Sequence, residues 1–285
     1  MSQARPVHIV TDSTSDLTWD LLAGQPVTIV PLTVEIGGAV FRDGVDLSRE
    51  DFLARLRQGE LPRTSQPSVG AFQAVYRELI EGGHEVVSIH ISSRLSGTFN
   101  SASTAARSVA PERIEVVDSL TVSMGLGWLV LEAAGMARGG ASAASIAGYI
   151  EERKQDARIV ALLDTLEYLQ RGGRIGRTSA FLGSALQIKP LVAVREGEVQ
   201  PLERVRTLKR ALDRLVELAA EIGPFDHLAV LHLGTPEAAA TLADRLSSFQ
   251  PGVELVRAQL GTVIGVYSGP GIMGFAGLVH RERTG

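Results

Sequence analysis

Hydroxyl side chains gather at three points of the sequence where an extended stretch is expected to lead into a helix. The three stretches are TDSTSDL (residues 11–17), RTSQPS (63–68) and SSRLSGT (92–98). Some of these side chains are candidates for capping, because Ser, Thr and Asp accept hydrogen bonds from the free amides of a helix's first turn. Ser65 and Thr98 are such candidates, and Gly97 would let the backbone approach a neighbour closely.

Capping does not account for every hydroxyl in these stretches, so we expect them together to bind an oxygen-rich anion. Helix N-termini present free amides and the positive end of the helix dipole, and both favour an anion. None of the three stretches contains a Lys. Neutral hydroxyls and amides without a Lys favour a singly charged carboxylate over a polyphosphate.

The elements that must position these stretches alternate between strands and helices in the first half of the chain. This alternation predicts an α/β domain with a parallel sheet over residues 1–156. The carboxyl ends of parallel strands share one edge of the sheet, and ligands bind at that edge. We therefore expect the polar residues that follow the strands to cluster there, including Asp12, Ser13 and Asp118.

The second half of the chain has a different pattern, with strand–turn–strand neighbours as well as helices. It predicts an α+β domain with a mixed or antiparallel sheet over residues 157–285. The uncharged stretch 258–279 has about the length of a membrane span. Its many glycines and Pro270 oppose a helix, however, and favour strand, tight turn, strand, with no stable membrane insertion.

Composition and missing motifs exclude several classes of function. The chain has 285 residues, a net charge of −4 and no Cys, which excludes disulfides, thiolate nucleophiles and Cys-bound zinc. The six His residues show no metal-ligand spacing, and no nucleotide-binding motif is present, so we expect no metal and no cofactor. The charge gives no reason to expect nucleic-acid binding. The N-terminus lacks the apolar segment of a signal peptide, and together with the absence of Cys this favours a cytoplasmic location.

Two arginine-containing motifs have both a structural and a functional interpretation. RGGRIGR, which contains Arg171 and Arg174, is either a solvated helix end that terminates at Gly or a positive patch for an acidic partner or a phosphate. ERVRT places Arg204 and Arg206 on one face of a strand, from which one of them could turn inward to pair with an anion.

An enzyme remains an alternative interpretation of the sheet edge. Asp12, Ser13 and Asp118 could serve a hydrolase or phosphotransferase, and a Ser–His–Asp triad could assemble across the fold. The sequence contains no G-x-S-x-G, no H-E-x-x-H and no P-loop, so no local signature identifies a nucleophile or a metal.

Taken in order along the chain, six motifs resemble those of the DegV family. They are VTDSTSDL, RTSQPS, SSRLSGTFNSA, DTLEYLQRGGRIG, IKPL and SGPG. The family comprises bacterial fatty-acid-binding proteins that act as the FakB-type subunit of fatty acid kinase. The resemblance implies two domains that hold one long-chain fatty acid between them, with the acyl tail in a closed apolar tunnel. It also implies a protein that is not itself the catalyst, because a separate ATP-dependent kinase subunit phosphorylates the bound carboxylate.

The resemblance also assigns roles to individual residues. Thr64 and Ser96 match the hydroxyls that bind the carboxylate, and Arg206 matches an Arg that supports this head-group network. Arg171 and Arg174 match the basic surface that meets the kinase. The chain departs from the family at Tyr267, two residues before GPG, where a His is common. A phenol can donate one hydrogen bond to a carboxylate but carries no positive charge near neutral pH.

Overall fold

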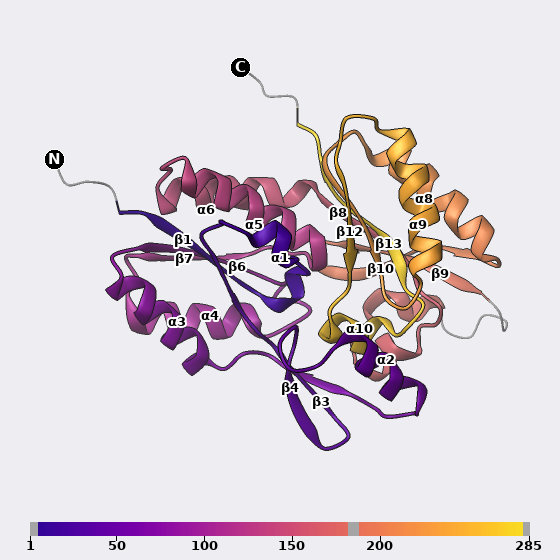
Figure 1. Cartoon of the computed structure of the whole chain (residues 1–285), viewed down its shortest axis with the longest axis horizontal. Coiled ribbons are helices and arrows are strands. Elements are labelled where there is room, and N and C mark those ends of the chain that lie inside the picture. The colour runs from indigo at the N-terminus through magenta and orange to yellow at the C-terminus, as the bar shows by residue number, and fades with distance from the viewer. Residues whose placement is uncertain (1–4, 182–187, 282–285) are drawn as a thin grey trace.

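The computed structural model describes residues 5–181 and 188–281, and these form two lobes, each built on its own main sheet (Figure 1). We call residues 5–156 the first lobe and residues 157–281 the second lobe. The division into domains at residue 156 stays a prediction. In the structure this position falls between the last turn of the first lobe, Lys154–Asp156, and the first strand of the second sheet, which begins at Ala157.

The first lobe contains the predicted parallel sheet, with strands in the order β2-β1-β6-β7. Its strands are β1 (Val7–Asp12), β2 (Val27–Val30), β6 (Glu85–His90) and β7 (Ile114–Asp118). Helices α3 (Val69–Glu81) and α4 (Thr98–Val109) cover one face, and α5 (Ser123–Arg138) and α6 (Ala143–Arg153) cover the other (Figure 1). Both faces are therefore buried, as is usual for parallel sheets.

A small antiparallel sheet in the first lobe was not predicted. It consists of β3 (Thr33–Ile36), β4 (Ala39–Arg42) and β5 (Arg63–Ser65), and α2 (Arg49–Arg57) lies between β4 and β5 in the sequence. The stretch RTSQPS contains Ser and Pro, which are typical of turns, yet its first three residues form β5. They do so because Thr64 pairs with Val34 of β3, a partner about thirty residues away.

The first hydroxyl stretch also differs from its prediction. A helix was expected near Leu17, but Ser13–Ser15 form a 3₁₀ turn, and the short α1 (Trp19–Leu22) follows. Asp12 caps the turn by accepting a hydrogen bond from the Thr14 amide at 3.1 Å. The backbone then reverses at Asp16, which adopts the left-handed conformation with φ of 54°.

The second lobe contains the predicted mixed sheet, with strands in the order β10-β9-β8-β13-β11-β12. The strands are β8 (Ala157–Leu162), β9 (Lys189–Arg195), β10 (Glu198–Val205), β11 (Phe225–His232), β12 (Leu255–Gln259) and β13 (Met273–Val279). Strands β11 and β12 are parallel, and the other neighbours are antiparallel. Helices α8 (Leu208–Ile222) and α9 (Pro236–Phe249) cover one face through a separate apolar cluster.

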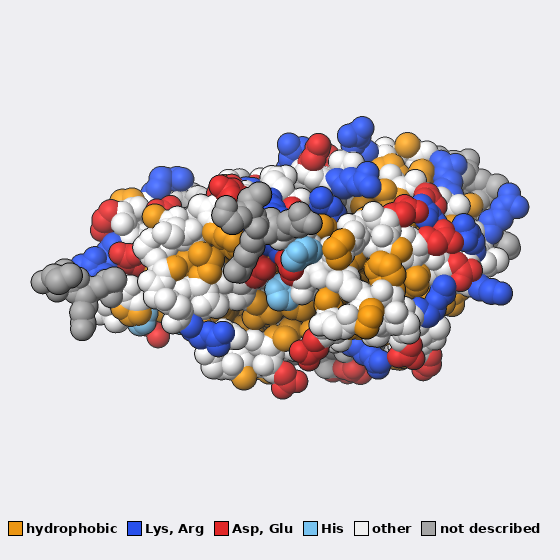
Figure 2. All heavy atoms as spheres, turned by 90° about the horizontal axis from the view of Figure 1, so that it is seen from above, with side chains coloured by type: hydrophobic (Ala, Val, Ile, Leu, Met, Phe, Trp, Pro, Cys, Tyr) orange, Lys and Arg blue, Asp and Glu red, His pale blue; other side chains and the backbone are white. Residues whose placement is uncertain are grey.

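On the face seen in Figure 2, charged side chains of both signs are spread over the second lobe. On α8, Arg214 lies 3.0 Å from Glu217 and 2.7 Å from Glu221. The opposite face of the second sheet belongs to the main core, which it shares with α5 of the first lobe. At this seam the Trp128 indole donates a hydrogen bond to the Ala276 carbonyl at 3.3 Å.

The Gly-rich stretch 258–279 contains a helix, α10 (Thr262–Ser268), where strand, turn, strand was expected. Asp43 explains the difference, because its carboxylate accepts hydrogen bonds from the Thr262 amide at 2.9 Å and from the Thr262 hydroxyl at 2.7 Å. This cap comes from the other lobe, so no local sequence signal predicts it. Among the residues that the structure describes, no helix combines the length and apolar character that a membrane crossing needs.

Gly274 allows β13 to pair closely with β8. A Cβ at this position would lie 2.1 Å from the Val160 carbonyl oxygen and 2.6 Å from the Ala161 Cα. We expect Gly274→Ala to lower the free energy of unfolding by about 1–3 kcal/mol, because the strands must separate to admit the methyl group. Urea unfolding followed by circular dichroism measures this change.

Gly135→Ala is the matched control for Gly274→Ala. Gly135 lies within α5, and nothing lies within 4 Å of the position that its Cβ would occupy. Alanine should therefore raise stability there by about 0.5–1 kcal/mol through helix propensity. Equal effects of the two substitutions would contradict the close packing assigned to Gly274.

Candidate functional site

A cavity lies between the two lobes and takes its lining from both. It encloses about 1010 Å³, the part open to solvent included. Most of the lining is aliphatic and comes from the second sheet, the start of α10 and the loops at the carboxyl edge of the first sheet. These aliphatic residues are Leu32, Ile91, Leu95, Val122, Ile159, Ala161, Leu163, Leu169, Val192, Ala193, Val194, Val199, Leu231, Leu260, Val263, Ile264 and Ile272. Such a surface favours an apolar ligand or ligand segment.

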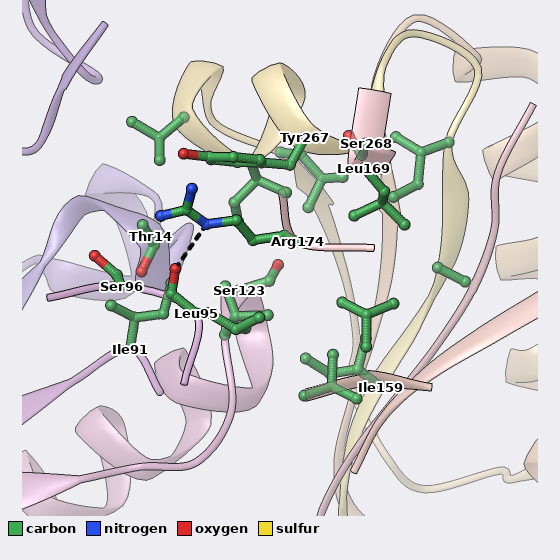
Figure 3. Close-up of a pocket in the computed structure, with 18 of the residues that line it drawn as sticks. Thr14, Ile91, Leu95, Ser96, Ser123, Ile159, Leu169, Arg174, Tyr267 and Ser268 are labelled. Carbon is green, nitrogen blue, oxygen red and sulfur yellow. Dashed lines mark hydrogen bonds between the residues drawn. The ribbon is translucent and has the colours of Figure 1, made fainter. Parts of the chain in front are cut away.

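Polar side chains gather toward one end of the cavity (Figure 3). There the Arg174 guanidinium lies between Tyr267 on one side and Ser96 and Leu95 on the other, and Thr14 lies next to Ser96. Ile159 lies away from this group, and Ser123 lies between the two ends. The cavity therefore has a polar end with one positive charge and an apolar remainder.

Thr64 and Tyr267 form a hydrogen bond across the lobes at this polar end. The Thr64 Oγ1 and Tyr267 Oη atoms lie 2.5 Å apart. Strand β5 carries Thr64 and α10 carries Tyr267, so the bond depends on both unexpected elements. Gly172 makes room for the Tyr267 ring, because a Cβ there would lie 2.3 Å from the ring Cδ1.

Arg174 is half-buried and points into the site. Its Nε donates a hydrogen bond to the Leu95 carbonyl at 3.1 Å, and its Nη1 donates one to the Gly172 carbonyl at 2.8 Å. The guanidinium carbon lies 4.8 Å from the centre of the Tyr267 ring, which is a cation–π contact. These contacts fix the charge at the polar end of the cavity and leave N–H groups for an anion.

The third hydroxyl stretch supplies two cavity residues, Leu95 and Ser96, and two residues that support them. Ser96 lines the cavity, and its Oγ lies 2.9 Å from the Thr98 Oγ1. Thr98 is fully buried and is not among the lining residues. Gly97 precedes α4, and a Cβ there would lie 2.5 Å from the Gln66 side-chain nitrogen. Ser65 is exposed and does not line the cavity, because neighbouring residues of β5 point to opposite sides.

The position of Arg206 does not match its predicted role in the head-group network. Val205, the last residue of β10, is buried, and the neighbouring Arg204 and Arg206 are exposed. The alternation of β10 thus turns both arginines away from the core. Arg204 stacks on the Phe181 ring at 4.4 Å. The charge at the polar end of the cavity belongs to Arg174 instead.

Arg171 and Arg174 therefore occupy different environments. Arg171, at the end of α7 (Glu167–Arg171), is exposed and forms an ion pair with Glu167 at 2.5 Å. Both arginines line a second, more polar hollow outside the cavity, together with Arg63 and Tyr168. Thr64, Arg174 and Tyr267 line both spaces and so separate them.

Five polar residues of the cavity wall were not predicted as ligand-binding residues: Thr14, Gln66, Ser123, Ser268 and Arg174, which was predicted to meet a partner. Thr14 lies in a stretch that was expected to bind an anion, but it was not singled out as a ligand-binding residue. The sequence offers a weak signal for Ser123, a hydroxyl among apolar residues at the start of a buried helix. Nothing in the sequence distinguishes Gln66 or Ser268 from ordinary turn residues.

The residues of the enzyme alternative hold the backbone and do not line the cavity. Asp12 accepts hydrogen bonds from the amides of Thr14 and Ile91, the Thr14 hydroxyl and the His90 ring. The Ser13 hydroxyl accepts one from the Leu32 amide, and Asp118 accepts one from the Ser93 amide. These partners occupy both carboxylate oxygens of Asp12, and none of the three residues is among those that line the cavity.

A chain of hydrogen bonds with the order Asp–His–Ser does exist in the first lobe. Asp12 Oδ2 lies 3.0 Å from His90 Nδ1, and His90 Nε2 lies 2.7 Å from Ser88 Oγ. All three side chains have no solvent exposure, and the Tyr76 hydroxyl donates to Ser88 at 2.8 Å. Because a substrate cannot reach Ser88, this chain stabilises the sheet and orients Thr14 at the cavity wall.

Comparison with known proteins decides the family of the chain. A family model described as "Uncharacterised protein, DegV family" matches residues 6–279. The chain belongs to the DegV family. A DegV domain-containing protein of Streptomyces coelicolor is 40% identical over 276 residues, which cover 95% of this chain and 98% of that protein.

Solved DegV structures share the fold of this chain. A DegV family protein from Thermus thermophilus, described by its fatty acid binding, has a TM-score of 0.89 and 36% identity, and the match covers 96% of this chain and 100% of that one. DegV of Bacillus subtilis, described as a fatty acid binding protein, has a TM-score of 0.86 and 34% identity, with 96% and 99% covered. Within the described residues of this DegV chain, no group of three His, Asp or Glu side chains is placed to hold a metal ion.

The Thr64–Tyr267 bond predicts energetic coupling between the lobes. In a double-mutant cycle of Thr64→Val and Tyr267→Phe, we expect a coupling of about 0.5–1.5 kcal/mol in the free energy of unfolding. Urea unfolding of the four proteins measures it. Ser142→Ala, which removes the cap of α6, should combine additively with Tyr267→Phe. A coupling near zero for the first pair would contradict the bond.

Proposed function

We propose that this protein binds one long-chain fatty acid, with the acyl tail in the inter-lobe cavity and the carboxylate at its polar end. The observation that carries this proposal is the cavity itself, which is aliphatic along most of its wall and has a single arginine at one end. The DegV proteins of Thermus thermophilus and Bacillus subtilis, which share the fold, are described as binding fatty acids. Burial of each CH₂ contributes about 0.8 kcal/mol, so the tail supplies most of the affinity.

The polar end has hydrogen atoms available for a carboxylate. Between Thr64 and Tyr267 only one hydroxyl proton is used, so the other can be donated to a ligand. The same holds for Ser96 and Thr98, and because Thr98 is buried, Ser96 is the residue that can reach the ligand. Arg174 adds a charge-assisted donor. In this arrangement Tyr267 donates a hydrogen bond and Arg174 supplies the charge.

The proposal includes a partner, an ATP-dependent fatty acid kinase subunit that phosphorylates the bound carboxylate. The DegV protein itself then presents the acid and does not catalyse the reaction, which places the encounter in the cytoplasm. Two features support this proposal. The polar hollow lies outside the head-group residues Thr64, Arg174 and Tyr267, and Arg171 is exposed at its rim. A phosphoryl donor would approach the carboxylate from this side.

Mass spectrometry tests the ligand directly. Native spectra of the freshly purified protein should show one added fatty acid, and denaturing spectra should show the bare chain. Removal of the lipid followed by titration with dodecanoic and octadecanoic acid should restore binding, more tightly for the longer acid. A protein that is empty when purified and refuses both acids would overturn the proposal.

Two substitutions distinguish the contribution of the acyl tail to binding from that of the head group. Ile159 lies away from the polar end. Ile159→Phe should lower the affinity for octadecanoic acid by about fourfold for each CH₂ group that no longer fits in the cavity. The affinity for the shorter dodecanoic acid should change less. Arg174→Gln should lower the affinity for both acids by a similar factor, roughly 10- to 150-fold, because it removes a charge-assisted hydrogen bond to the carboxylate. Thermal melting checks that both variants fold. The reverse pattern would contradict the proposed orientation.

Charge reversal at the rim of the hollow tests the partner. Arg171→Glu should reduce acyl-phosphate formation by the kinase subunit at least about tenfold, since like charges at an interface repel. The affinity for the fatty acid should not change, because Arg171 does not line the cavity. Arg107→Glu, at an exposed position of α4 outside the RGGRIGR motif and outside the hollow, is the charge-matched control. Equal turnover by both variants would exclude docking through Arg171.

A further inference from the structure

Asp16 joins both lobes to the cavity wall. Its Oδ2 lies 2.5 Å from the Ser123 Oγ, and its Oδ1 accepts a hydrogen bond from the Gly261 amide at 2.8 Å. Ser123 begins α5 of the first lobe and lines the cavity, and Gly261 precedes α10 of the second lobe. The Asp16 carboxyl group therefore connects one wall residue to the helix that carries Tyr267.

The backbone at this contact is held in an unfavourable conformation. Asp16 and Ser123 both have positive φ, 54° and 53°, although neither is a glycine. Residues in such conformations persist only where the surrounding structure fixes them, and they gather at functional sites. Asp16 is only 4% exposed and Ser123 only 2%. Both belong to the inter-lobe seam and neither belongs to the proposed head-group set.

A second carboxylate, Asp43, faces Asp16 across the start of α10. Asp43 accepts hydrogen bonds from Thr262, and both carboxyl groups approach Gly261 so closely that a Cβ there would lie 3.1 Å from Asp16 and 3.3 Å from Asp43. The nearest cation is Arg49 of α2, whose Nε donates to the Leu260 carbonyl at 2.9 Å. Two acids and one arginine thus surround the first turn of α10.

The protonation of Asp16 is sensitive to this environment. The pKa of Asp16 is raised from 3.8 to about 7, chiefly by burial and also by repulsion from Asp43, although the Ser123 and Gly261 hydrogen bonds and Arg49 act in the opposite direction. Burial and the charge of Arg49 lower the pKa of His232 in β11. Asp12, before the same turn, is occupied by its own four donors.

We propose that Asp16 is a positioning residue whose protonation controls the opening of the cavity between the lobes. This inference rests on the proposed fatty acid binding. In the closed seam the Asp16 carboxyl group accepts hydrogen bonds from the Ser123 hydroxyl and the Gly261 amide, and a proton on Asp16 removes the negative charge that would otherwise be buried there. When Asp16 loses its proton, a second negative charge lies buried beside Asp43, and separation of α10 from the first lobe lets water reach it.

The direction of the pH effect follows from the difference between closed and open states. The closed state holds the proton up to about pH 7, and an open state in which water solvates Asp16 restores its ordinary pKa. The equilibrium constant for opening should therefore rise by up to about tenfold for each pH unit between pH 5 and 7, and it should become constant above pH 7. Ligand release that requires opening should accelerate over the same range.

Release of a long-chain alcohol with a fluorescent tail tests this proposal, because its head group does not titrate. Dissociation is followed by stopped flow from pH 5 to 9 after mixing with excess unlabelled ligand. The wild-type rate should rise toward pH 7 and then level. Asp16→Asn is neutral at every pH, and it can accept from the Gly261 amide through its Oδ1 and donate to the Ser123 Oγ through its Nδ2, so it should release slowly with a flat profile. Asp20→Asn, an exposed residue of α1, should keep the wild-type profile.

Asp43→Asn provides a second variant in case Asp16→Asn does not fold. Its amide oxygen can still cap α10, but the repulsion is removed, so the midpoint of the profile should move to lower pH. Identical profiles for the wild type and Asp16→Asn, or an unchanged midpoint in Asp43→Asn, would overturn the proposal for Asp16. A wild-type protein that binds neither the alcohol nor a fatty acid would instead overturn the proposed function.

Discussion

Helix α10 contributes Tyr267 to the cavity from the second lobe, but the first lobe holds its first turn. Asp43 accepts the hydrogen bonds of Thr262, Asp16 accepts that of Gly261, and Arg49 donates to Leu260. Seven residues are too few to form a stable helix in isolation. These long-range contacts therefore determine both that α10 exists and where Tyr267 meets Thr64, and the shape of the polar end depends on them.

The buried polar groups of the first sheet have a related role. Tyr76, Ser88, His90 and Asp12 form one hydrogen-bonded chain that ends at Thr14 in the cavity wall. Such groups are costly to bury unless each finds a partner. Each of these four groups has a hydrogen-bond partner. Their hydrogen-bonded chain therefore fixes the carboxyl edge of the first sheet, where the hydroxyl stretches begin. The order of bonds resembles a catalytic triad, yet burial gives it a structural role.

A long acyl chain and a carboxylate make opposite demands on a binding site. The tail gains from complete removal from water, whereas the head group needs donors and a charge. The seam between two lobes meets both demands, because the second sheet supplies a broad aliphatic face and the loops of the first sheet supply hydroxyls. Arg174 supplies a positive charge to the polar end of the cavity, and its contacts with Leu95, Gly172 and Tyr267 keep it in place.

The sequence by itself determined the parallel sheet, the mixed sheet, the DegV family and the presence of Thr64, Ser96 and Tyr267 at one site, because period, turn residues and ordered motifs are local signals. Tertiary structure alone decided the small sheet that places Thr64, the helix that places Tyr267, the outward direction of Arg206 and the inward direction of Arg174. Each of these depends on partners far along the chain: Val34 for Thr64, Asp43 for α10, and Leu95 for Arg174. A strand pairing or a cap supplied from another lobe leaves no periodic trace in the segment that receives it.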